Sequence, residues 1–390
     1  MYVIGNEEVE AVRRVIESGQ LFRYRGGEGG ETDRFEAEWS EKIGVKHTIA
    51  VTSGTAALAC AVVGLGIGPG DEVIVPAYTF MATALAPLMA GAVPIIAEID
   101  ESLTLDPADV ERKITPRTKA IMPVYMNGWP CDMDAIMAIA NKHGLKVIED
   151  ACQADGGSYK GKRLGSIGHA GGFSFNQFKI ITAGEGGAMV TDDDATFERA
   201  LIYHDGGCCF RAHAAEMGVE FFAGSNFRTN EITSAILRAQ LQRLDGLLAA
   251  LRAEKKTIIA ELSGESAFEL NPVHDLDGDC GATVAFLFET ATETRAFQQK
   301  LADDGIGTGC PIDSGRHIYP NWEPVLQQRG AHHPRLDAFK LTSVPVEYTP
   351  DMCPRTLDIL ARSLTLGTSP TRSRDDLMAQ IARIKKAARG

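Results

Sequence analysis

GFSFNQFKIITAGEGGAMV, residues 172–190, is the stretch around which the rest of the chain is organised. Lys179 follows the apolar run 173–175 and precedes a glycine cluster, Gly184 to Gly187, so it is predicted to lie on a turn that leaves a buried strand. Burial lowers the pKa of a lysine and leaves part of it as the neutral amine, which condensation with an aldehyde requires. Lys179 is therefore a candidate Schiff-base residue, and the alternative is a surface lysine on an ordinary loop.

The composition is that of an ordinary globular protein. The 390 residues are 44% hydrophobic and 23% charged, which is enough for one large or two moderate domains. The formal net charge is −13 with dispersed acidic residues, so a nucleic-acid partner has no electrostatic support. The eight cysteines have no metal-like spacing and indicate reduced thiols, and no metal site is expected. Without a signal-like start or a membrane-length apolar run, we expect a soluble, cytoplasmic protein with no membrane partner.

Short strand-like runs alternate with helical periods between residues 47 and 150. The predicted strands are 47–51, 72–76, 93–97, 119–124 and 145–149. Strands that alternate with helices form βαβ units, in which helices cover both faces of a parallel sheet. The sequence therefore predicts an α/β fold with a mainly parallel sheet in a large domain.

The two ends of the chain differ from this pattern. Amphipathic helices are predicted from a cap at Asn6 to an end at Gly19, and near 32–43. A long helical pattern begins at Asn230 and carries the chain out of the sheet. A strand at 284–288 and helices at 293–303 and from Asp375 onward then indicate an α+β region. We therefore expect a large domain with an N-terminal arm at 1–250 and a small C-terminal domain at 251–390.

Four predicted strands are followed by residues that could bind a ligand or take part in catalysis. Ligands of open α/β sheets bind at the carboxyl ends of the strands. Gly54 and Thr55 begin a predicted helix, and the free backbone N–H groups at its start could bind a phosphate. The same residues would also fit an ordinary strand-to-helix turn with no ligand. Phe80 could stack on a flat heterocycle or simply pack in the core. Asp150 could hold a protonated pyridine nitrogen or cap a helix. The fourth end delivers Ser174 and then Lys179.

Together these segments resemble a known family. The motifs are SGTAAL at 53–58, VPAYTFMATA at 75–84, EDACQADG at 149–156, FSFNQFK at 173–179, GEGGAMVTDD at 184–193 and SNFRTNE at 225–231. In this order they are similar to the DegT/DnrJ/EryC1/StrS family of pyridoxal-phosphate-dependent aminotransferases, which act mainly on keto-sugars and keto-cyclitols. The resemblance implies fold type I, with a mainly parallel seven-stranded sheet in the large domain and a smaller α+β domain.

The resemblance also implies roles for single residues. Lys179 would bond pyridoxal 5′-phosphate and later move a proton to and from the substrate carbon. Asp150 would hold the pyridine nitrogen, Phe80 would stack on the ring, and Gln153 would lie near the 3-oxygen of the ring. The residues implied to bind phosphate are Gly54, Thr55, Ser174 and, reaching the neighbouring subunit, Asn226. A homodimer with shared active sites follows from the last of these.

Several positions depart from the pattern of the family. Residues 123–128 read PVYMNG rather than PVHLYG, and Asp155 stands where histidine is usual. Residues 224–229 read GSNFRT rather than GYNYRM. The SNFR and TAGEGG forms are closer to cyclitol and aminohydroxybenzoate-synthase-like members than to enzymes of nucleotide-linked sugars.

The candidate substrate residues come from three places. Arg23 and Tyr24 lie in an aromatic and glycine-rich loop at 21–27, which could equally be a connector. Arg228 lies in the SNFR motif. His317 and Tyr319, in RHIYPNW at 316–322, could form a substrate wall or a loop anchored by aromatic packing.

The leading hypothesis is a ping-pong transamination in which glutamate or glutamine supplies nitrogen to a ketone on a polyhydroxylated ring. The runner-up is a pyridoxal-phosphate-dependent dehydratase or aromatising enzyme of the aminohydroxybenzoate-synthase type. A non-catalytic regulator that keeps the cofactor pocket is a third possibility, which no basic face supports. A nicotinamide oxidoreductase is weaker, because no GxGxxG follows the first strand.

Overall fold

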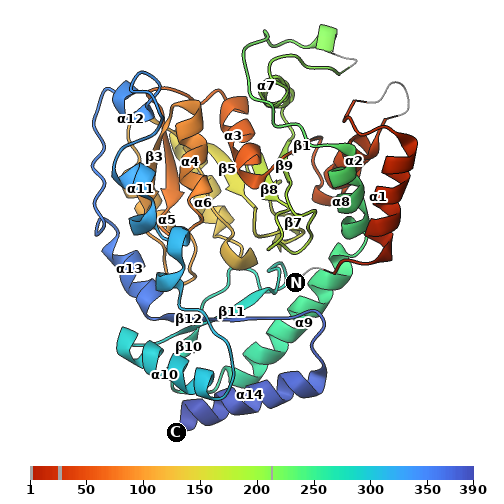
Figure 1. The fold of residues 1–390 in the computed structure, drawn as a ribbon. Coiled ribbons are helices and arrows are strands. Elements are labelled where there is room, and N and C mark those ends of the chain that lie inside the picture. Colours follow the sequence, from red (N-terminus) through yellow and green to blue (C-terminus); the bar gives the residue numbers. More distant parts are fainter. Residues whose placement is uncertain (1–2, 25–28, 212–213) are drawn as a thin grey trace.

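The structure, a computed structural model, describes residues 3–24, 29–211 and 214–390. A seven-stranded sheet forms its centre, in the order β1-β9-β8-β5-β4-β2-β3 (Figure 1). The strands are β1 His47–Val51, β2 Glu72–Pro76, β3 Val93–Ala97, β4 Thr118–Ile121, β5 Lys146–Asp150, β8 Ala170–Ser174 and β9 Gly187–Thr191. Only β9 runs opposite to the other six strands. The predicted α/β fold with a mainly parallel sheet is confirmed.

Helices cover both faces of this sheet. They are α2 Glu31–Ile43, α3 Gly54–Gly64, α4 Ala82–Ala90, α5 Pro107–Lys113, α6 Met133–His143 and α7 Asp194–His204, while α1 Asn6–Ser18 packs on α8 Glu231–Leu241 at the outer edge of the molecule. The chain steps outward from β1 through α3 and α4 to β3, and then back through α5 and α6 to β5. Because the direction reverses between β2 and β4, a crevice is expected outside the carboxyl ends of these strands.

The local sequence explains the central elements. The α3 helix has apolar or small residues on every side and is buried almost throughout, which is what a helix against the middle of a sheet requires. The predicted bounds of the first three strands agree with the structure, whereas β4 ends at Ile121 rather than at 124. Beyond that point Val124 makes only an isolated parallel bridge to Asp150.

The loop between β8 and β9 forms the predicted turn. The Phe175 N–H donates to the Gly186 carbonyl over 2.9 Å, and the Gln177 N–H donates to the Gly184 carbonyl over 3.0 Å. Gly184 has a φ of 82°, which favours glycine. The chain therefore returns from β8 into β9 beside Lys179, as the glycine cluster indicated.

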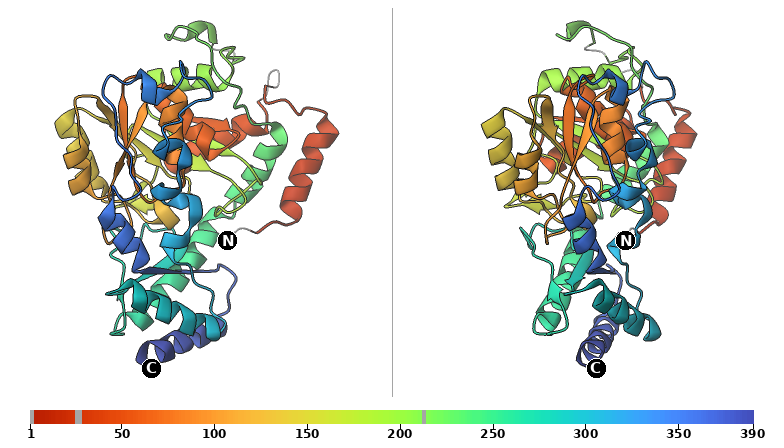
Figure 2. Two further views of the ribbon diagram at one scale, coloured as in Figure 1. Left: turned by 60° about the vertical axis from the view of Figure 1, so that its left-hand side comes forward. Right: turned by 90° about the vertical axis from the view of Figure 1, so that its left-hand side faces the viewer.

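The C-terminal part is a smaller α+β layer (Figures 1 and 2). The predicted long helix from Asn230 is two helices, which break at Gln242 and Arg243. The remaining elements are α8 Glu231–Leu241, α9 Leu244–Leu262, β10 Glu269–Leu270, β11 Thr283–Leu287, α10 Ala291–Asp303, α11 Glu323–Leu326, α12 Ala338–Leu341, α13 Pro354–Ala361, β12 Ser363–Gly367 and α14 Arg374–Arg389, with β6 Ser158–Tyr159 and β7 Lys162–Arg163 as a separate hairpin. Strands β10, β11 and β12 form an antiparallel sheet. No helix within the described ranges is long and apolar enough to cross a membrane.

Part of the C-terminal half returns to the large sheet. Tyr319, Trp322 and Tyr348 are buried in the same apolar core as the strands of the central sheet. The helix α9 spans residue 250 and connects the two layers in Figure 1. The division into 1–250 and 251–390 stays a prediction.

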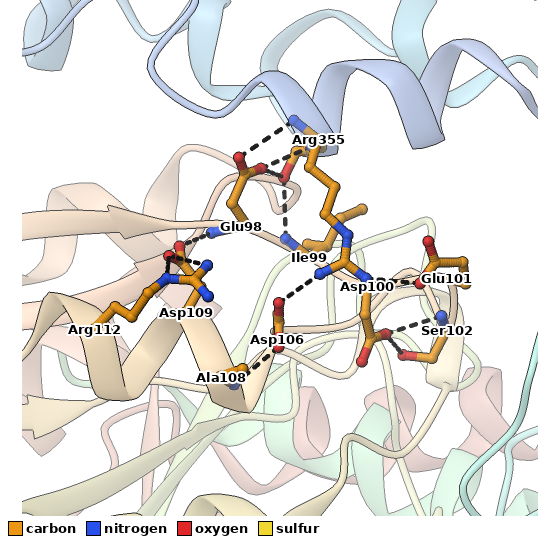
Figure 3. Close-up of polar contacts among 11 residues, drawn as sticks. Glu98, Ile99, Asp100, Glu101, Ser102, Asp106, Ala108, Asp109, Arg112 and Arg355 are labelled. Atoms are coloured by element: carbon orange, nitrogen blue, oxygen red, sulfur yellow. Dashed lines mark hydrogen bonds and ion pairs between the residues drawn. The ribbon is translucent and has the colours of Figure 1, made fainter.

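A polar cluster joins α13 to the end of β3 (Figure 3). The Glu98 carboxylate accepts hydrogen bonds from the N–H of Arg355 (3.2 Å), the N–H of Thr356 (2.7 Å) and the Thr356 hydroxyl (2.6 Å). The Arg355 guanidinium donates to Asp106 over 2.6 Å and to Glu101 over 2.7 Å. Glu98 therefore supplies the N-terminal cap that α13 lacks in its own sequence.

Candidate active site

A cavity of about 510 Å³ lies at the carboxyl ends of β2, β5 and β8. It brings together eight of the residues predicted from the sequence, which are Gly54, Thr55, Phe80, Asp150, Gln153, Ser174, Lys179 and His317. They come from segments that are distant in the chain, because parallel strands present their carboxyl ends at one edge of the sheet. The four strand ends singled out in the sequence therefore form one site.

Lys179 lies on the loop between β8 and β9 and is half-buried. Its backbone N–H donates to the Asn176 carbonyl over 2.9 Å, which holds the loop in a turn. The Nζ atom forms no hydrogen bond or ion pair with the described part of the chain, and the side chain lines the cavity. Its neighbour Phe178 is 80% exposed at the cavity mouth. The amine is thus unpaired and open to a ligand, although it is less buried than expected.

Asp150 is the buried carboxylate of the site. Its Oδ2 accepts a hydrogen bond from the Thr83 hydroxyl over 2.7 Å, and its Oδ1 accepts one from the Cys152 N–H over 3.1 Å. Thr79 and Thr83 exchange a further hydroxyl hydrogen bond of 2.7 Å. These donors are neutral, and a carboxylate can accept about four hydrogen bonds. Asp150 therefore remains available to a cationic group in the cavity.

The first turn of α3 forms the end of the cavity suited to an anion. Ser53 caps the helix by accepting from the Ala56 N–H over 3.1 Å. The N–H groups of Gly54 and Thr55 have no acceptor among the described residues. A Cβ at Gly54 would lie 2.8 Å from both Cys152 Sγ and Ser174 Cβ, so only glycine allows this close approach. The unpaired donors and the helix dipole both favour a phosphate here.

Two side chains could contact the faces and edge of a ring. Phe80 is 45% exposed in the cavity, and its ring centroid lies 5.3 Å from that of His317. Gln153 Oε1 accepts from the Asn127 N–H over 2.9 Å, while its Nε2 lies 3.3 Å from Met126 Sδ, a weak acceptor. The Gln153 amide can therefore donate to a ligand. Burial lowers the pKa of His317, with Lys179 contributing, so its imidazole is neutral at pH 7.

Three predicted residues lie outside the cavity but near the surface. Asn226 is exposed and accepts from the Arg228 N–H over 3.2 Å. The Arg228 guanidinium pairs with Asp205 over 2.6 Å and lies over the ring of Phe22. The Tyr24 hydroxyl donates to the same Asp205 over 2.9 Å. This cluster is separate from Lys179 within one chain.

The structure does not support a substrate role for two of the predicted residues. Arg23 is fully buried, and its guanidinium donates a hydrogen bond of 2.6 Å to the Glu36 carboxylate. Its positive charge is therefore paired inside the protein rather than exposed to a ligand. Tyr319 is also fully buried, with its hydroxyl 2.7 Å from the Pro350 carbonyl. Both side chains stabilise packing. Gly26 and Gly27, which were predicted to belong to the loop after Arg23, lie outside the described residues.

Sequence reasoning missed several residues of the cavity. Thr83 holds Asp150, and Asn176 donates to Glu185 over 3.0 Å at the cavity mouth. Cys152 lies against Gly54. Thr83 follows Thr79 by four residues, but Thr79 lies before α4, so no local pattern predicts their contact or the contact of Thr83 with β5.

Comparison with known proteins gives a consistent result. The DegT/DnrJ/EryC1/StrS aminotransferase family profile matches residues 3–384. The chain is 38% identical over 310 residues to 3-amino-5-hydroxybenzoate synthase of Amycolatopsis mediterranei (strain S699), covering 78% of each chain. It is 37% identical over 345 residues to dTDP-3-amino-3,4,6-trideoxy-alpha-D-glucose transaminase of Streptomyces venezuelae, covering 86% of each. A crystal structure of 3-amino-5-hydroxybenzoic acid synthase matches with a TM-score of 0.82 at 30% identity, covering 100% of this chain and 98% of that one.

Proposed function

The chain belongs to the DegT/DnrJ/EryC1/StrS aminotransferase family, and from this premise we propose that it transfers an amino group from glutamate or glutamine to a keto-sugar or keto-cyclitol. It is a pyridoxal-phosphate-dependent aminotransferase of the sugar-biosynthesis type. The observation that carries the proposal is the convergence of Lys179, Asp150 and the Gly54–Thr55 turn on one cavity.

The residues around the cavity fit pyridoxal 5′-phosphate. We propose that Asp150 holds the pyridine nitrogen, because its carboxylate is buried and has no cationic partner. The unpaired N–H groups of Gly54 and Thr55, with Ser174 beside them, suit the phosphate. The Phe80 ring could stack on the pyridine ring, and the side-chain amide of Gln153 could donate a hydrogen bond to the 3-oxygen of that ring. When bound, the cofactor supplies an electron sink for the reacting carbon.

The unpaired amine of Lys179 supports two roles. We propose that Lys179 would hold the cofactor covalently and would be free to act as a base once the amino donor is bound. Once released, Lys179 Nζ accepts the proton from the α-carbon of the donor and later returns one to the acceptor carbon. In the first half-reaction the donor leaves as a 2-oxo acid, and in the second the ketone gains the amino group, which is a ping-pong sequence.

Two smaller cavities next to the site can hold the acceptor. They measure about 440 Å³ and 180 Å³, and both share Asn127, Gln153 and His317 in their walls. Further polar groups of the larger cavity come from Tyr78, Gln298, Thr308, Ser314 and Thr365. The Thr308 hydroxyl is buried without a hydrogen-bond partner. Hydroxyl and amide groups of this kind suit a polyhydroxylated ring.

A second copy of the chain is part of the proposal. Lys179 is the only lysine or arginine among the described residues that line the three cavities. The carboxylates of an amino donor require cations, which must then come from elsewhere. The exposed position of Asn226, outside its own cavity, supports a role at the phosphate of a neighbouring subunit. We therefore propose a homodimer with shared active sites. All eight cysteines are free, which supports a reducing, cytoplasmic location.

A dehydratase or aromatising reaction is the second candidate. It is favoured by the identity of 38% to an aminohydroxybenzoate synthase and by the SNFR motif. The retained lysine supports transamination over dehydration. A non-catalytic regulator is a third candidate, and the demonstration of a half-reaction with an amino donor would dispose of it.

The decisive experiment follows the visible absorbance of the purified holoenzyme. Glutamate or glutamine should convert the cofactor to its amino form, and a keto-cyclitol or nucleotide keto-sugar should restore the original spectrum. Turnover of an aminoshikimate-type precursor without an amino donor would instead indicate the aromatising reaction. Full turnover by K179A would refute the assignment of Lys179.

A further inference from the structure

Asp155 is a buried carboxyl that the fold leaves almost without partners. It lies in the turn after β5, with its side chain fully buried. Neither carboxyl oxygen forms a hydrogen bond of normal length with the described residues. The one backbone donor that acts on it is the N–H of Ile181, close to Lys179 in the loop between β8 and β9. Buried carboxyls normally have partners, so this one requires an explanation.

The surroundings of Asp155 contain a single charged group. Lys179, from the loop between β8 and β9, is the only charged side chain that acts on it among the described residues. The charge of Asp155 also acts on the thiols of Cys152, in the same turn, and of Cys280, in the segment before β11. Burial raises the pKa of both thiols, so they stay neutral. Lys179 is therefore the one charged side chain in the described part of the chain that acts on Asp155. It also acts on His317 and Cys152, whose side chains are neutral.

The proton on Asp155 depends on the charge of its neighbour. Burial raises the pKa of Asp155 well above its usual range, while Lys179 and the Ile181 N–H oppose this increase. A buried carboxyl is therefore neutral when the nearby nitrogen is neutral, and it ionises more readily when that nitrogen is positive.

Resting on the proposed function, we infer that Asp155 is a positioning residue that adjusts the charge of the Lys179 nitrogen from the buried side of the active site. When the nitrogen takes up a proton, the carboxyl gives one up, so the N–H bond that forms is matched by the O–H bond that breaks. The combined charge of the fully buried Asp155 and the half-buried Lys179 nitrogen then stays constant. This allows Lys179 to alternate between a neutral base and an acid during the proposed reaction.

The test compares D155N with the wild-type holoenzyme. The variant keeps the shape of the side chain but cannot ionise, so the nitrogen of the Lys179–cofactor bond should lose stabilisation of its protonated form. We expect the midpoint of the pH titration of visible absorbance to fall by about one pH unit. E185Q is the comparison, because Glu185 is an exposed carboxylate at the same cavity. Its effect should be several times smaller owing to screening by solvent. An unchanged midpoint in D155N, or an equal shift in E185Q, would overturn the inference.

A second measurement uses the wild-type protein, so it does not depend on whether D155N folds. Infrared difference spectra of the wild-type holoenzyme should show a protonated carboxyl band that weakens as the Lys179 nitrogen gains its proton. A band that stays constant through this titration, or one that persists in D155N, would contradict the inference. The two proposals fail separately: a wild-type protein without visible absorbance from the bound cofactor contradicts the proposed function, whereas visible absorbance with an unmoved midpoint contradicts only the role of Asp155.

Discussion

The Thr83 hydroxyl donates a hydrogen bond of 2.7 Å to Oδ2 of Asp150. Thr83 lies in the first turn of α4, after β2, whereas Asp150 ends β5, and β4 separates the two strands in the sheet. Thr79 holds the same hydroxyl from the preceding turn. The orientation of the carboxylate at the centre of the site is thus set by a different βα unit from the one that carries it.

Removal of the Thr83 hydroxyl should weaken cofactor binding. A hydrogen bond to a charged group contributes about 1.5–3 kcal/mol, so T83V should raise the dissociation constant of pyridoxal 5′-phosphate roughly 10- to 100-fold. The measurement is fluorescence or absorbance titration of the apoprotein with the cofactor. T83S keeps the hydroxyl and is the matched control. Equal affinities of T83V and T83S would show that Asp150 needs no support from α4.

A methyl group at Gly54 should also disturb the cofactor site. The Cβ of G54A would lie 2.8 Å from Cys152 Sγ and from Ser174 Cβ, which is closer than real Cβ contacts, so the first turn of α3 must shift. We expect at least about a tenfold loss of cofactor affinity. In contrast, a Cβ at Gly246, within α9, meets no atom within 4 Å. G246A should therefore keep full affinity and raise the free energy of unfolding by about 0.5–1 kcal/mol.

The buried His204 should make the fold sensitive to acid. Burial, aided by the positive charges of Arg23 and Arg211, lowers the pKa of His204 from 6.5 to about 4. The unfolded chain therefore binds this proton at a higher pH than the folded chain. The stabilisation is fully present above pH 6.5 and is lost as the pH falls from 6.5 towards 4. Its size is roughly 3 kcal/mol at most.

Denaturant unfolding measured between neutral and mildly acidic pH tests this contribution. The free energy of unfolding of the wild type should fall across this range, and H204Q should show a flatter dependence, whatever its stability at neutral pH. H332Q, at an exposed histidine, should retain the slope of the wild type. If H204Q and the wild type had parallel curves, other groups would govern the acid sensitivity.

The elements that could be predicted from sequence are those specified by local signals. Strand ends at Asp150 and Ser174, the Gly54 turn and the Lys179 loop depend on short runs of apolar residues followed by turn residues. Parallel topology then places these ends at one edge, so most of the site could be inferred. The break between α8 and α9 could not, because no glycine or proline interrupts the apolar pattern at Gln242 and Arg243.

What remained hidden depends on contacts between distant segments. The Thr83–Asp150 hydrogen bond joins residues from separate βα units. Arg23 is a charged residue in a glycine-rich loop, and both features predict an exposed side chain. It is buried instead, because its guanidinium pairs with Glu36 of α2. Tyr319 likewise packs in the core beneath the Pro350 carbonyl. Such pairings become visible only when the tertiary fold is known, since local patterns do not encode them.

The cap that Glu98 provides to α13 should be a major link between the end of β3 and the C-terminal layer. Because the carboxylate is buried and accepts three hydrogen bonds from Arg355 and Thr356, its replacement leaves donors unpaired at a helix N-terminus. E98Q should lower the free energy of unfolding by about 1–3 kcal/mol, measured by denaturant unfolding. E101Q removes an exposed ion pair with the same Arg355 and should cost less than about 1 kcal/mol. If both variants lost the same stability, charge attraction to Arg355 rather than capping of α13 would be the dominant contribution.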